Sequence, residues 1–169
     1  ESLHFAYLPG VFSGGHLDPG SAMLLRELPP APGHVLDIGG GYGALSRPLL
    51  GRAQSLTLLE DDWPSLLSAQ QNLGEQASVL HSDVDEALTQ DQTFTTIISN
   101  PPFHVGGLVV LETAAAFVEA ACARLERGGN FYLVANRFLP YEPLLEARFA
   151  IVRTLAVGSH KVLQAHKLD

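Results

Sequence analysis

The chain contains the segment Val35-Leu-Asp-Ile-Gly-Gly-Gly-Tyr-Gly43. A short apolar run, His34–Ile38, leads into a glycine-rich turn, which is typical of a buried strand followed by a helix. Glycine lets the chain turn sharply and lets a ligand approach the backbone closely. The segment therefore predicts a ligand-binding turn at the carboxyl end of a strand, although a tight turn without a ligand has the same composition.

One acidic residue, Asp37, precedes the glycines at the end of this strand. Dinucleotide-binding turns favour an apolar residue there, because the pyrophosphate is anionic and binds N–H groups at a helix start. A carboxylate suits a cationic ligand instead, such as the ammonium group of S-adenosylmethionine. We therefore expect S-adenosylmethionine as the cofactor, with the turn residues Asp37, Ile38, Gly39, Gly41 and Gly43 binding it.

Two further acids end the next predicted strands. Glu60 follows the run Ser55–Leu59 and can accept hydrogen bonds from both ribose hydroxyl groups. Asp83 can accept from an adenine amine while Val84 packs on the ring. Both acids have plainer interpretations, a solvated acid at a helix start for Glu60 and a helix N-cap for Asp83. Asp61 is included with the cofactor site, although it has the same solvated alternative.

The loop Asn100-Pro-Pro-Phe103 directly follows the predicted strand Phe94–Ser99. Its two prolines stiffen the backbone. The Asn100 amide oxygen and the Pro101 carbonyl form a pair of acceptors that can hold a planar amine, with its nitrogen lone pair aimed at a methyl donor. The ring of Phe103 offers a flat face for a base. The expected catalytic residues are Asn100, Pro101, Pro102 and Phe103, and Asn100 is also expected to contact the cofactor.

Four residues outside these motifs are further candidates. His104 can accept a proton late in the reaction or be a plain loop residue. Arg137, after the fifth predicted strand, is the best candidate for a phosphate or base contact, and the expected substrate-binding residues are Phe103, His104 and Arg137. Asp18 and Ser21 can close over the cofactor from one side or form a turn and a helix cap.

Short apolar runs alternate with helical stretches along the chain, which indicates a parallel α/β sheet. The expected strands are His34–Ile38, Ser55–Leu59, Ala77–His81, Phe94–Ser99 and Asn130–Ala135. The expected helices are Ala44–Gly51, Pro64–Leu73, Asp83–Leu88, Leu108–Arg127 and Tyr141–Arg148, and the buried stripe of the longest comprises Leu111, Ala115, Val118, Cys122 and Leu125. Ala150–Val157 and Lys161–His166 predict a closing antiparallel hairpin through Gly158-Ser159, which disfavours a plain nicotinamide-binding fold.

The 169 residues, 46% of them hydrophobic, fit one globular domain, 1–169, in which residues 1–32 form a lead-in segment on the core. The seven histidines and single cysteine show no metal-ligand spacing, so no metal is expected. No apolar run has the roughly 20 residues of a membrane span. The lone cysteine agrees with a reducing cytoplasm, which is the expected location. Because the chain starts at Glu1, we expect that a further segment precedes it.

The net charge of −8 disfavours a nucleic-acid binder, whose domains usually carry a basic face. The charge is uneven, because Ala53–Ala123 contains ten acids and no lysine or arginine, while all ten basic residues lie elsewhere. A polyanion would be repelled from the acidic part of the surface and would approach from another side.

On these residues the sequence resembles class I S-adenosylmethionine-dependent methyltransferases of the Asn-Pro-Pro-aromatic group. More closely, it resembles the catalytic domain of bacterial ribosomal RNA small-subunit guanine-N2 methyltransferases of the RsmC type, and their large-subunit relatives. The similarity runs over nearly the whole chain, through Leu8-Pro-Gly-Val-Phe-Ser13, Asn100-Pro-Pro-Phe-His104 and Val134-Ala-Asn-Arg-Phe-Leu-Pro-Tyr141. Gly40 stands where many relatives have Cys or another small residue, and we expect little steric demand there.

The resemblance implies a Rossmann-like, seven-stranded, mostly parallel sheet with the C-terminal antiparallel hairpin. It implies that Asp37, Gly39, Gly41, Glu60, Asp83 and Asn100 contact the cofactor, and that Asn100, Pro101 and Phe103 hold the guanine. It also implies ribosomal RNA or a ribosomal subunit as partner, and an N-terminal RNA-binding domain before Glu1. The implied activity is methylation of the exocyclic N2 amine of a guanine in 16S-type ribosomal RNA.

Two other functions remain open at this point. The same loop can hold a glutamine amide, so an N-methyltransferase acting on a protein glutamine or on a small-molecule amine is the first alternative. A non-catalytic cofactor-binding or scaffold module within a larger RNA enzyme is the second. The lead-in residues favour the RNA substrate, and the intact loops favour catalysis.

Overall fold

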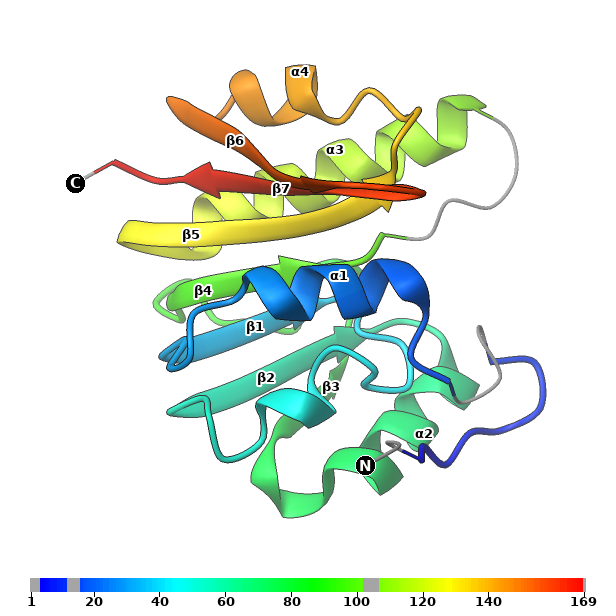
Figure 1. The fold of residues 1–169 in the computed structure, drawn as a ribbon. Coiled ribbons are helices and arrows are strands. Elements are labelled where there is room, and N and C mark those ends of the chain that lie inside the picture. The colour runs from blue at the N-terminus through cyan, green and yellow to red at the C-terminus, as the bar shows by residue number, and fades with distance from the viewer. Residues whose placement is uncertain (1–3, 12–15, 102–106, 169) are drawn as a thin grey trace.

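A seven-stranded sheet forms the centre of the molecule, with helices on both of its faces (Figure 1). The computed structural model describes residues 4–11, 16–101 and 107–168, with the backbone alone over 107–111. The strands are β1 (His34–Ile38), β2 (Ser55–Glu60), β3 (Ser78–His81), β4 (Phe94–Ser99), β5 (Leu125–Asn136), β6 (Ile151–Val157) and β7 (His160–His166). The helices are α1 (Pro19–Glu27), α2 (Trp63–Leu73), α3 (Gly107–Arg124) and α4 (Glu142–Glu146), with short 3-10 turns η2 (Arg47–Leu49) and η3 (Gly74–Gln76).

The strand order is β3-β2-β1-β4-β5-β7-β6. Strands β1 to β5 pair in parallel, whereas β7 pairs antiparallel with both β5 and β6. The chain runs outward from β1 to β3 and then crosses back to β4, so β1 and β4 flank the point at which the order reverses. Open α/β sheets bind ligands at the carboxyl ends of the strands at such a point. The predicted Rossmann-like, mostly parallel seven-stranded sheet and its C-terminal antiparallel hairpin are confirmed.

Two apolar layers hold the helices on the sheet. On one face Leu24 of α1 and Leu73 of α2 are buried with side chains such as Val35 and Ile98. On the other face α3 and α4 bury an apolar cluster that includes Phe117 and Phe131. Strand β1 is central, and its side chains from Val35 to Ile38 are all buried. The apolar run that the sequence showed thus reflects burial on both faces of a parallel sheet.

Two predicted helices are wrong. Residues 41–50 form turns and the 3-10 element η2 instead of the helix Ala44–Gly51, because Pro48 lacks the N–H that an α-helix needs. The segment Asp83–Leu88 consists of bends and turns. Val84 has a positive φ of 46°, a conformation that is strained for a β-branched residue and incompatible with a helix.

The long predicted helix ends three residues early. It stops at Arg124, and strand β5 begins at Leu125, where the sequence predicted helix as far as Arg127. The buried stripe was also displaced in part. Val118 and Leu125 are buried as predicted, but Ala115 and Cys122 are only half-buried, and Ala114, Phe117 and Ala121 take the inner face. The Leu111 side chain lies outside the described residues.

The first described residues run along α2. Asn72 of α2 bonds both backbone groups of Ala6, and the backbone N–H of Leu8 donates to Ser68 Oγ. Helix α1 packs against β5 and β7, and in the view of Figure 1 it lies in front of β4 and β1. Its first turn is at the carboxyl end of β4, where Ser21 bonds Asn100. Within the described part of the chain, no helix combines the length and the apolarity that crossing a membrane requires.

Candidate functional site

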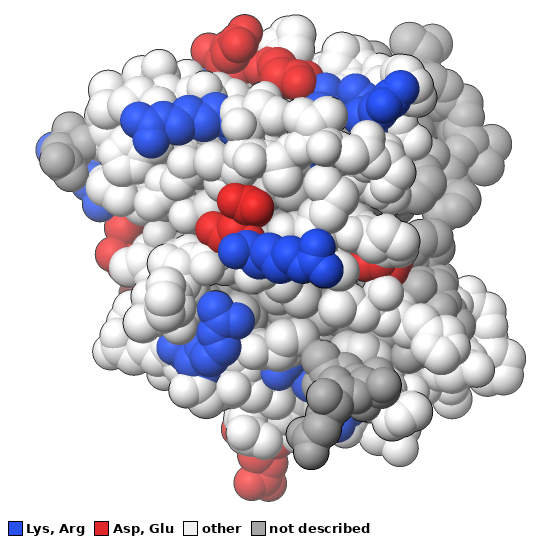
Figure 2. All heavy atoms as spheres, viewed as in Figure 1, with Lys and Arg blue, Asp and Glu red and all other residues white. Residues whose placement is uncertain are grey.

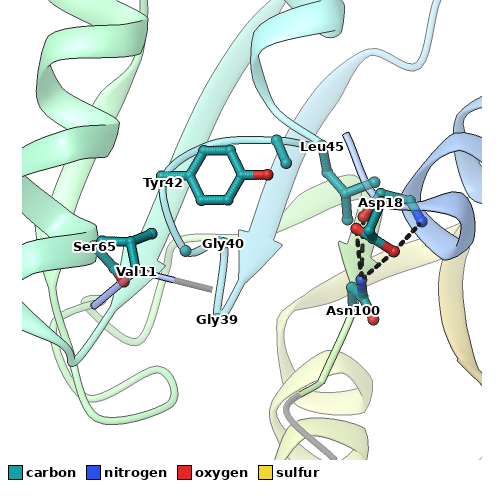
Figure 3. A pocket seen from close by; sticks show the side chains of 11 residues that line it. Val11, Asp18, Gly39, Gly40, Tyr42, Leu45, Ser65 and Asn100 are labelled. Atoms are coloured by element: carbon teal, nitrogen blue, oxygen red, sulfur yellow. Dashed lines mark hydrogen bonds between the residues drawn. The ribbon is translucent and has the colours of Figure 1, made fainter. Parts of the chain in front are cut away.

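Two clefts meet at the glycine turn, beside the point where the strand order reverses. The first has an empty volume of about 420 Å³, and its lining includes Asp18, Ser21, Gly39, Gly41, Tyr42 and Asn100 (Figure 3). The second has about 620 Å³, and its lining includes Gly39, Glu60, Asp83, Val84, Thr113 and Phe117. Gly39 lines both clefts, so one extended ligand laid over the turn would occupy both.

The backbone of the turn requires glycine at three places. Gly39, Gly41 and Gly43 have φ values of 64°, 57° and 88°, in the left-handed region that other residues rarely adopt. A Cβ on Gly41 would meet no heavy atom within 4 Å, so the space above this residue is open. The conformation of Gly41 thus leaves its backbone accessible to a ligand.

The expectation of little steric demand at Gly40 is wrong for this chain. A Cβ on Gly40 would lie 2.5 Å from Leu58 Cδ1 and Cγ and 3.0 Å from Asp37 Cγ. Leu58 is fully buried, so neither side can move without disturbing the core. Glycine is needed here because the turn lies directly against β2.

Asp37 lies near the end of β1, directly before the glycine turn. It is fully buried; its Oδ2 accepts a hydrogen bond of 2.7 Å from Ser46 Oγ, and its Oδ1 has no partner among the described residues. Burial raises the pKa of this carboxyl from 3.8 to about 7; the Ser46 hydrogen bond opposes the shift and the charge of Glu60 adds to it. A buried carboxylate that lacks one partner is costly by itself, and it marks a place where a positive charge would be stabilised.

Glu60 closes the turn from the end of β2. Its Oε2 accepts from the backbone N–H of Gly41 at 2.7 Å, and its Oε1 accepts from the backbone N–H groups of Asp61 and Asp62 at 3.1 and 2.9 Å. Burial is the main cause of the raised pKa of Glu60, and the backbone hydrogen bonds oppose it. Glu60 is thus more than a solvated acid, because it couples the glycine turn to the start of α2.

The second cleft is polar on one side and apolar on the other. The exposed Asp83 and the half-buried Val84 lie on one of its walls, and Phe117 and Thr113 of α3 form another. Asp83 caps no helix, because no helix follows it. The strained Val84 holds its side chain against the core cluster of α3. Asp61 also lines this cleft, which leaves its predicted cofactor role open.

Asn100 stands at the end of β4 and lines the first cleft with Asp18 and Ser21. Its Nδ2 donates to Ser21 Oγ at 3.1 Å and faces both carboxylate oxygens of Asp18, at 3.4 Å (Oδ2) and 3.5 Å (Oδ1) (Figure 3). The neighbouring Ser99 Oγ donates to the Ile38 carbonyl at 2.8 Å. This bond ties the end of β4 to the end of β1, and so fixes Asn100 beside the glycine turn.

The remaining predicted residues fall into two groups. Pro101 is buried at the start of the loop, whereas Pro102, Phe103 and His104 lie outside the described residues. Arg137 is exposed after β5, and its guanidinium carbon lies 4.5 Å from the ring centroid of Phe138. Because β5 lies parallel beside β4, this pair stands at the same edge of the sheet as Asn100.

Sequence reasoning missed several residues of the site. Ser46, which bonds Asp37, lies in a segment that was predicted as a helix. Phe117 and Thr113 were read as ordinary positions of a long helix. The exposed ring of Phe138, which directly follows Arg137, lines neither cleft. Over the described ranges, no three His, Cys, Asp or Glu side chains gather as a metal site would require.

Comparison with known proteins agrees with this geometry. The model of the methyltransferase small domain family matches residues 2–164. The chain belongs to the methyltransferase small domain family. Two curated relatives have the name ribosomal RNA small subunit methyltransferase C. The Pseudomonas aeruginosa protein (strain LESB58) is 40% identical over 92% of this chain, and the Sodalis glossinidius protein is 43% identical over 98%.

Solved structures place this methyltransferase small domain in the same fold. A Thermus thermophilus 16S rRNA N2 methyltransferase (RsmC), solved in complex with AdoMet and guanosine, superposes with a TM-score of 0.90. It is 51% identical over 96% of this chain. A Pyrococcus furiosus methyltransferase, 21% identical, has a TM-score of 0.73 and shares the fold. The chain spans about half the length of the curated relatives it matches, 48% and 49% in the two cases above, and 47% of the Thermus chain.

Proposed function

We propose that this chain is the catalytic domain of a ribosomal RNA methyltransferase, which moves a methyl group from S-adenosylmethionine to the N2 amine of a guanine in 16S-type RNA. The observation that carries the proposal is the position of Asn100. Its amide is held at the end of β4, in the same cleft as the glycine turn. The similarity to a relative solved with AdoMet and guanosine supports both ligands.

The residues present fit this cofactor. The buried, half-partnered carboxylate of Asp37 suits a cationic molecule, since S-adenosylmethionine carries an ammonium and a sulfonium charge. Gly41 leaves open space where a side chain would otherwise fill the turn. Glu60 and Asp83 supply acceptors for ribose hydroxyls and an adenine amine, and Phe117 provides an apolar wall for the ring. We assign these residues, with Ile38, Gly39, Gly43, Asp61 and Val84, to cofactor binding.

The bound cofactor supplies an electrophilic methyl group. The protein positions the nucleophile, because Asn100 Oδ1 and the Pro101 carbonyl accept the two hydrogens of a planar amine. This arrangement directs the nitrogen lone pair along the line of transfer, and a preorganised pair of acceptors stabilises the positive charge that develops on nitrogen. The amine nitrogen would take the methyl group that the cofactor supplies, and its proton would leave once the nitrogen is cationic. No strong base is needed before transfer.

We assign the substrate side to the loop after β4 and to the end of β5. Phe103 stacks on the guanine, Pro102 stiffens the loop, and His104 accepts a contact or the released proton. Arg137 contacts a phosphate or base. The exposed ring of Phe138, 77% accessible and stacked against Arg137, adds a second flat surface at the same edge.

The surface charge favours a partner domain for RNA binding. On the face that carries α1, Figure 2 shows Lys and Arg side chains as separate groups with Asp and Glu beside them. Such a mixed surface gives little general attraction for a polyanion. We therefore propose that residues 1–169 form one methyltransferase domain, and that an N-terminal domain supplies much of the RNA affinity. An RNA substrate of this kind would place the protein in the cytoplasm.

Methyl transfer from labelled S-adenosylmethionine tests the proposal. The purified protein is offered small ribosomal subunits, free 16S RNA and release-factor protein, with Asn100→Ala as the control. Nuclease digestion and mass spectrometry should identify N2-methylguanosine from RNA, and the control should give none. Label in protein alone would contradict the proposal and favour a glutamine N-methyltransferase. Failure to bind S-adenosylhomocysteine would favour a scaffold.

A further inference from the structure

We propose that Asp18 is a positioning residue that fixes which end of the Asn100 amide faces the substrate, and that Ser21 helps to hold the amide in place. The inference rests on the proposed function, because it concerns how Asn100 presents its oxygen to an amine. Asp18 and Asn100 are 82 positions apart in the sequence, and helix α1 brings them together. In Figure 3 the two side chains point toward one another across the mouth of the first cleft.

The chemistry of the pair selects one orientation of the amide. A carboxylate has only acceptor atoms, whereas an amide has a donor end and an acceptor end of nearly the same shape. Asn100 Nδ2 faces both oxygens of Asp18, at 3.4 and 3.5 Å, and donates to Ser21 Oγ at 3.1 Å. The amide oxygen is therefore directed away from Asp18. A flipped amide would set its oxygen against a negative charge and would lose the contacts with Asp18, whereas Ser21 Oγ, which can donate as well as accept, would bond either end of the amide.

The orientation matters because the reacting amine is itself a donor. With Nδ2 held by Asp18, Oδ1 of Asn100 is left as the acceptor for the amine. In the flipped state the amide would present N–H groups to the N–H groups of the amine. Neither the backbone of β4 nor the size of the site distinguishes the two states, so a charged neighbour is the means by which this site selects one.

Helix α1 holds Asp18 and Ser21 firmly. Asp18 is its N-cap, and Asp18 Oδ1 accepts from the backbone N–H of Ser21 at 3.1 Å. Ser21 is only 2% exposed, and the helix packs on β5 and β7. The cap fixes the direction of the Asp18 carboxylate. The same carboxylate therefore caps α1 and holds Asn100 Nδ2. The sequence left open whether these residues cap a helix or close over the cofactor; they form the cap and also line the cleft.

Substitutions that preserve the cap separate positioning from stability. Asp18→Asn and Asp18→Ser both keep a good N-cap. Asn at this position turns an NH2 group toward Asn100, and Ser no longer reaches it. Asp62→Asn is the matched control, because the exposed Asp62 caps α2 through the N–H of Ser65 at 3.0 Å in the same Asp-x-x-Ser arrangement. It also removes one negative charge.

The first readout is kinetic. Both Asp18 variants should lower kcat by about 100-fold, the usual scale for losing one preorganised hydrogen-bonding group. The dissociation constant of S-adenosylhomocysteine should stay within about threefold, and the melting temperature should match that of Asp62→Asn, whose kcat should stay near that of the unmodified protein. A wild-type kcat in Asp18→Asn would overturn the proposal, as would an equal loss in Asp62→Asn.

The second readout does not depend on activity. NMR of the Asn side-chain amides, with the Asn100 pair assigned by its loss in Asn100→Ala, reports the bonding of Nδ2. The pair should show slowed hydrogen exchange in the unmodified protein and faster exchange in Asp18→Ser. Exchange that is fast in both would overturn the positioning role. If no acceptor is methylated, the proposed function fails, and the NMR result still decides the orientation of Asn100.

Discussion

The buried carboxyl of Asp37 should make both stability and cofactor affinity depend on pH. Its pKa is raised from 3.8 to about 7, mainly by burial. Because the folded state holds the proton more tightly than the unfolded state, this group favours folding most fully below pH 4. The contribution is lost as pH rises through 7. One pKa unit corresponds to about 1.4 kcal/mol, so the loss between pH 5 and pH 8 is about 3 kcal/mol.

Asp37→Asn removes this titration and keeps the shape of the side chain. The variant should gain stability relative to the unmodified protein as pH rises from 5 to 8. For a domain of this size, about 3 kcal/mol corresponds to a relative shift in melting temperature of roughly 6 to 12 °C. Melting curves by calorimetry or circular dichroism at half-unit steps of pH measure it. Glu60, whose pKa is also raised, is present in both proteins, so its own titration largely cancels.

Ligand binding gives the opposite dependence. If the carboxylate must be charged to stabilise a cationic ligand, the affinity for S-adenosylhomocysteine, which retains the ammonium, should fall about fivefold from pH 7 to pH 6, because the charged fraction of a group with a pKa of about 7 falls by that factor. Asp37→Asn should bind weakly at both values. Ser46→Ala is a useful control, because removing its hydrogen bond should raise the pKa of Asp37 further and move both transitions upward. The reasoning would be refuted if the melting temperatures of the unmodified protein and of Asp37→Asn changed equally with pH between pH 5 and pH 8.

Other substitutions probe the remaining parts of the site. Asn100→Ala should abolish methyl transfer while S-adenosylhomocysteine affinity stays within about tenfold, under ~1.4 kcal/mol; a substantial residual rate would refute positioning by the amide. Glu60→Gln should lower stability by about 1–3 kcal/mol and weaken cofactor binding, because an NH2 group would face backbone N–H groups; calorimetry of folding and binding checks both. Gly40→Ala should cost about 1–3 kcal/mol through its clash with Leu58, and an unchanged melting temperature would show that the turn relaxes freely. Arg137→Ala should weaken RNA binding in filter or fluorescence assays and leave cofactor affinity unchanged.

The topology could be predicted because its signals are local. The buried strands β1 and β2 are short apolar runs that end at or just before a glycine or polar residue, namely Gly39 after β1 and Glu60 at the end of β2. The closing hairpin is marked by Gly158-Ser159 between two alternating runs. The errors came where one residue outweighs a local pattern. Pro48 prevents a helix, Val84 takes a positive φ, and Leu125 pairs with β4 although it continues the helical spacing.

The part of the candidate site that could be predicted follows from one rule, that the carboxyl ends of parallel strands lie at the same edge of the sheet. That rule brought Asp37, Glu60 and Asn100 together, and the described geometry agrees with it. It could not reveal which partner holds each group. Asp18 contacts Asn100 from α1, which packs on β5 and β7, and Ser46 bonds Asp37 from a segment of turns where the sequence predicted a helix.

A crystal structure of this protein with S-adenosylhomocysteine and guanosine would test the central claim most directly. The informative measurement is the pair of distances from the guanine N2 to Asn100 Oδ1 and to the Pro101 carbonyl oxygen. We expect both to lie near 3 Å, with the sulfur of the cofactor over the glycine turn and Asn100 Nδ2 still on Asp18. A guanine bound elsewhere, or an Asn100 amide that offers Nδ2 to the base, would contradict the account.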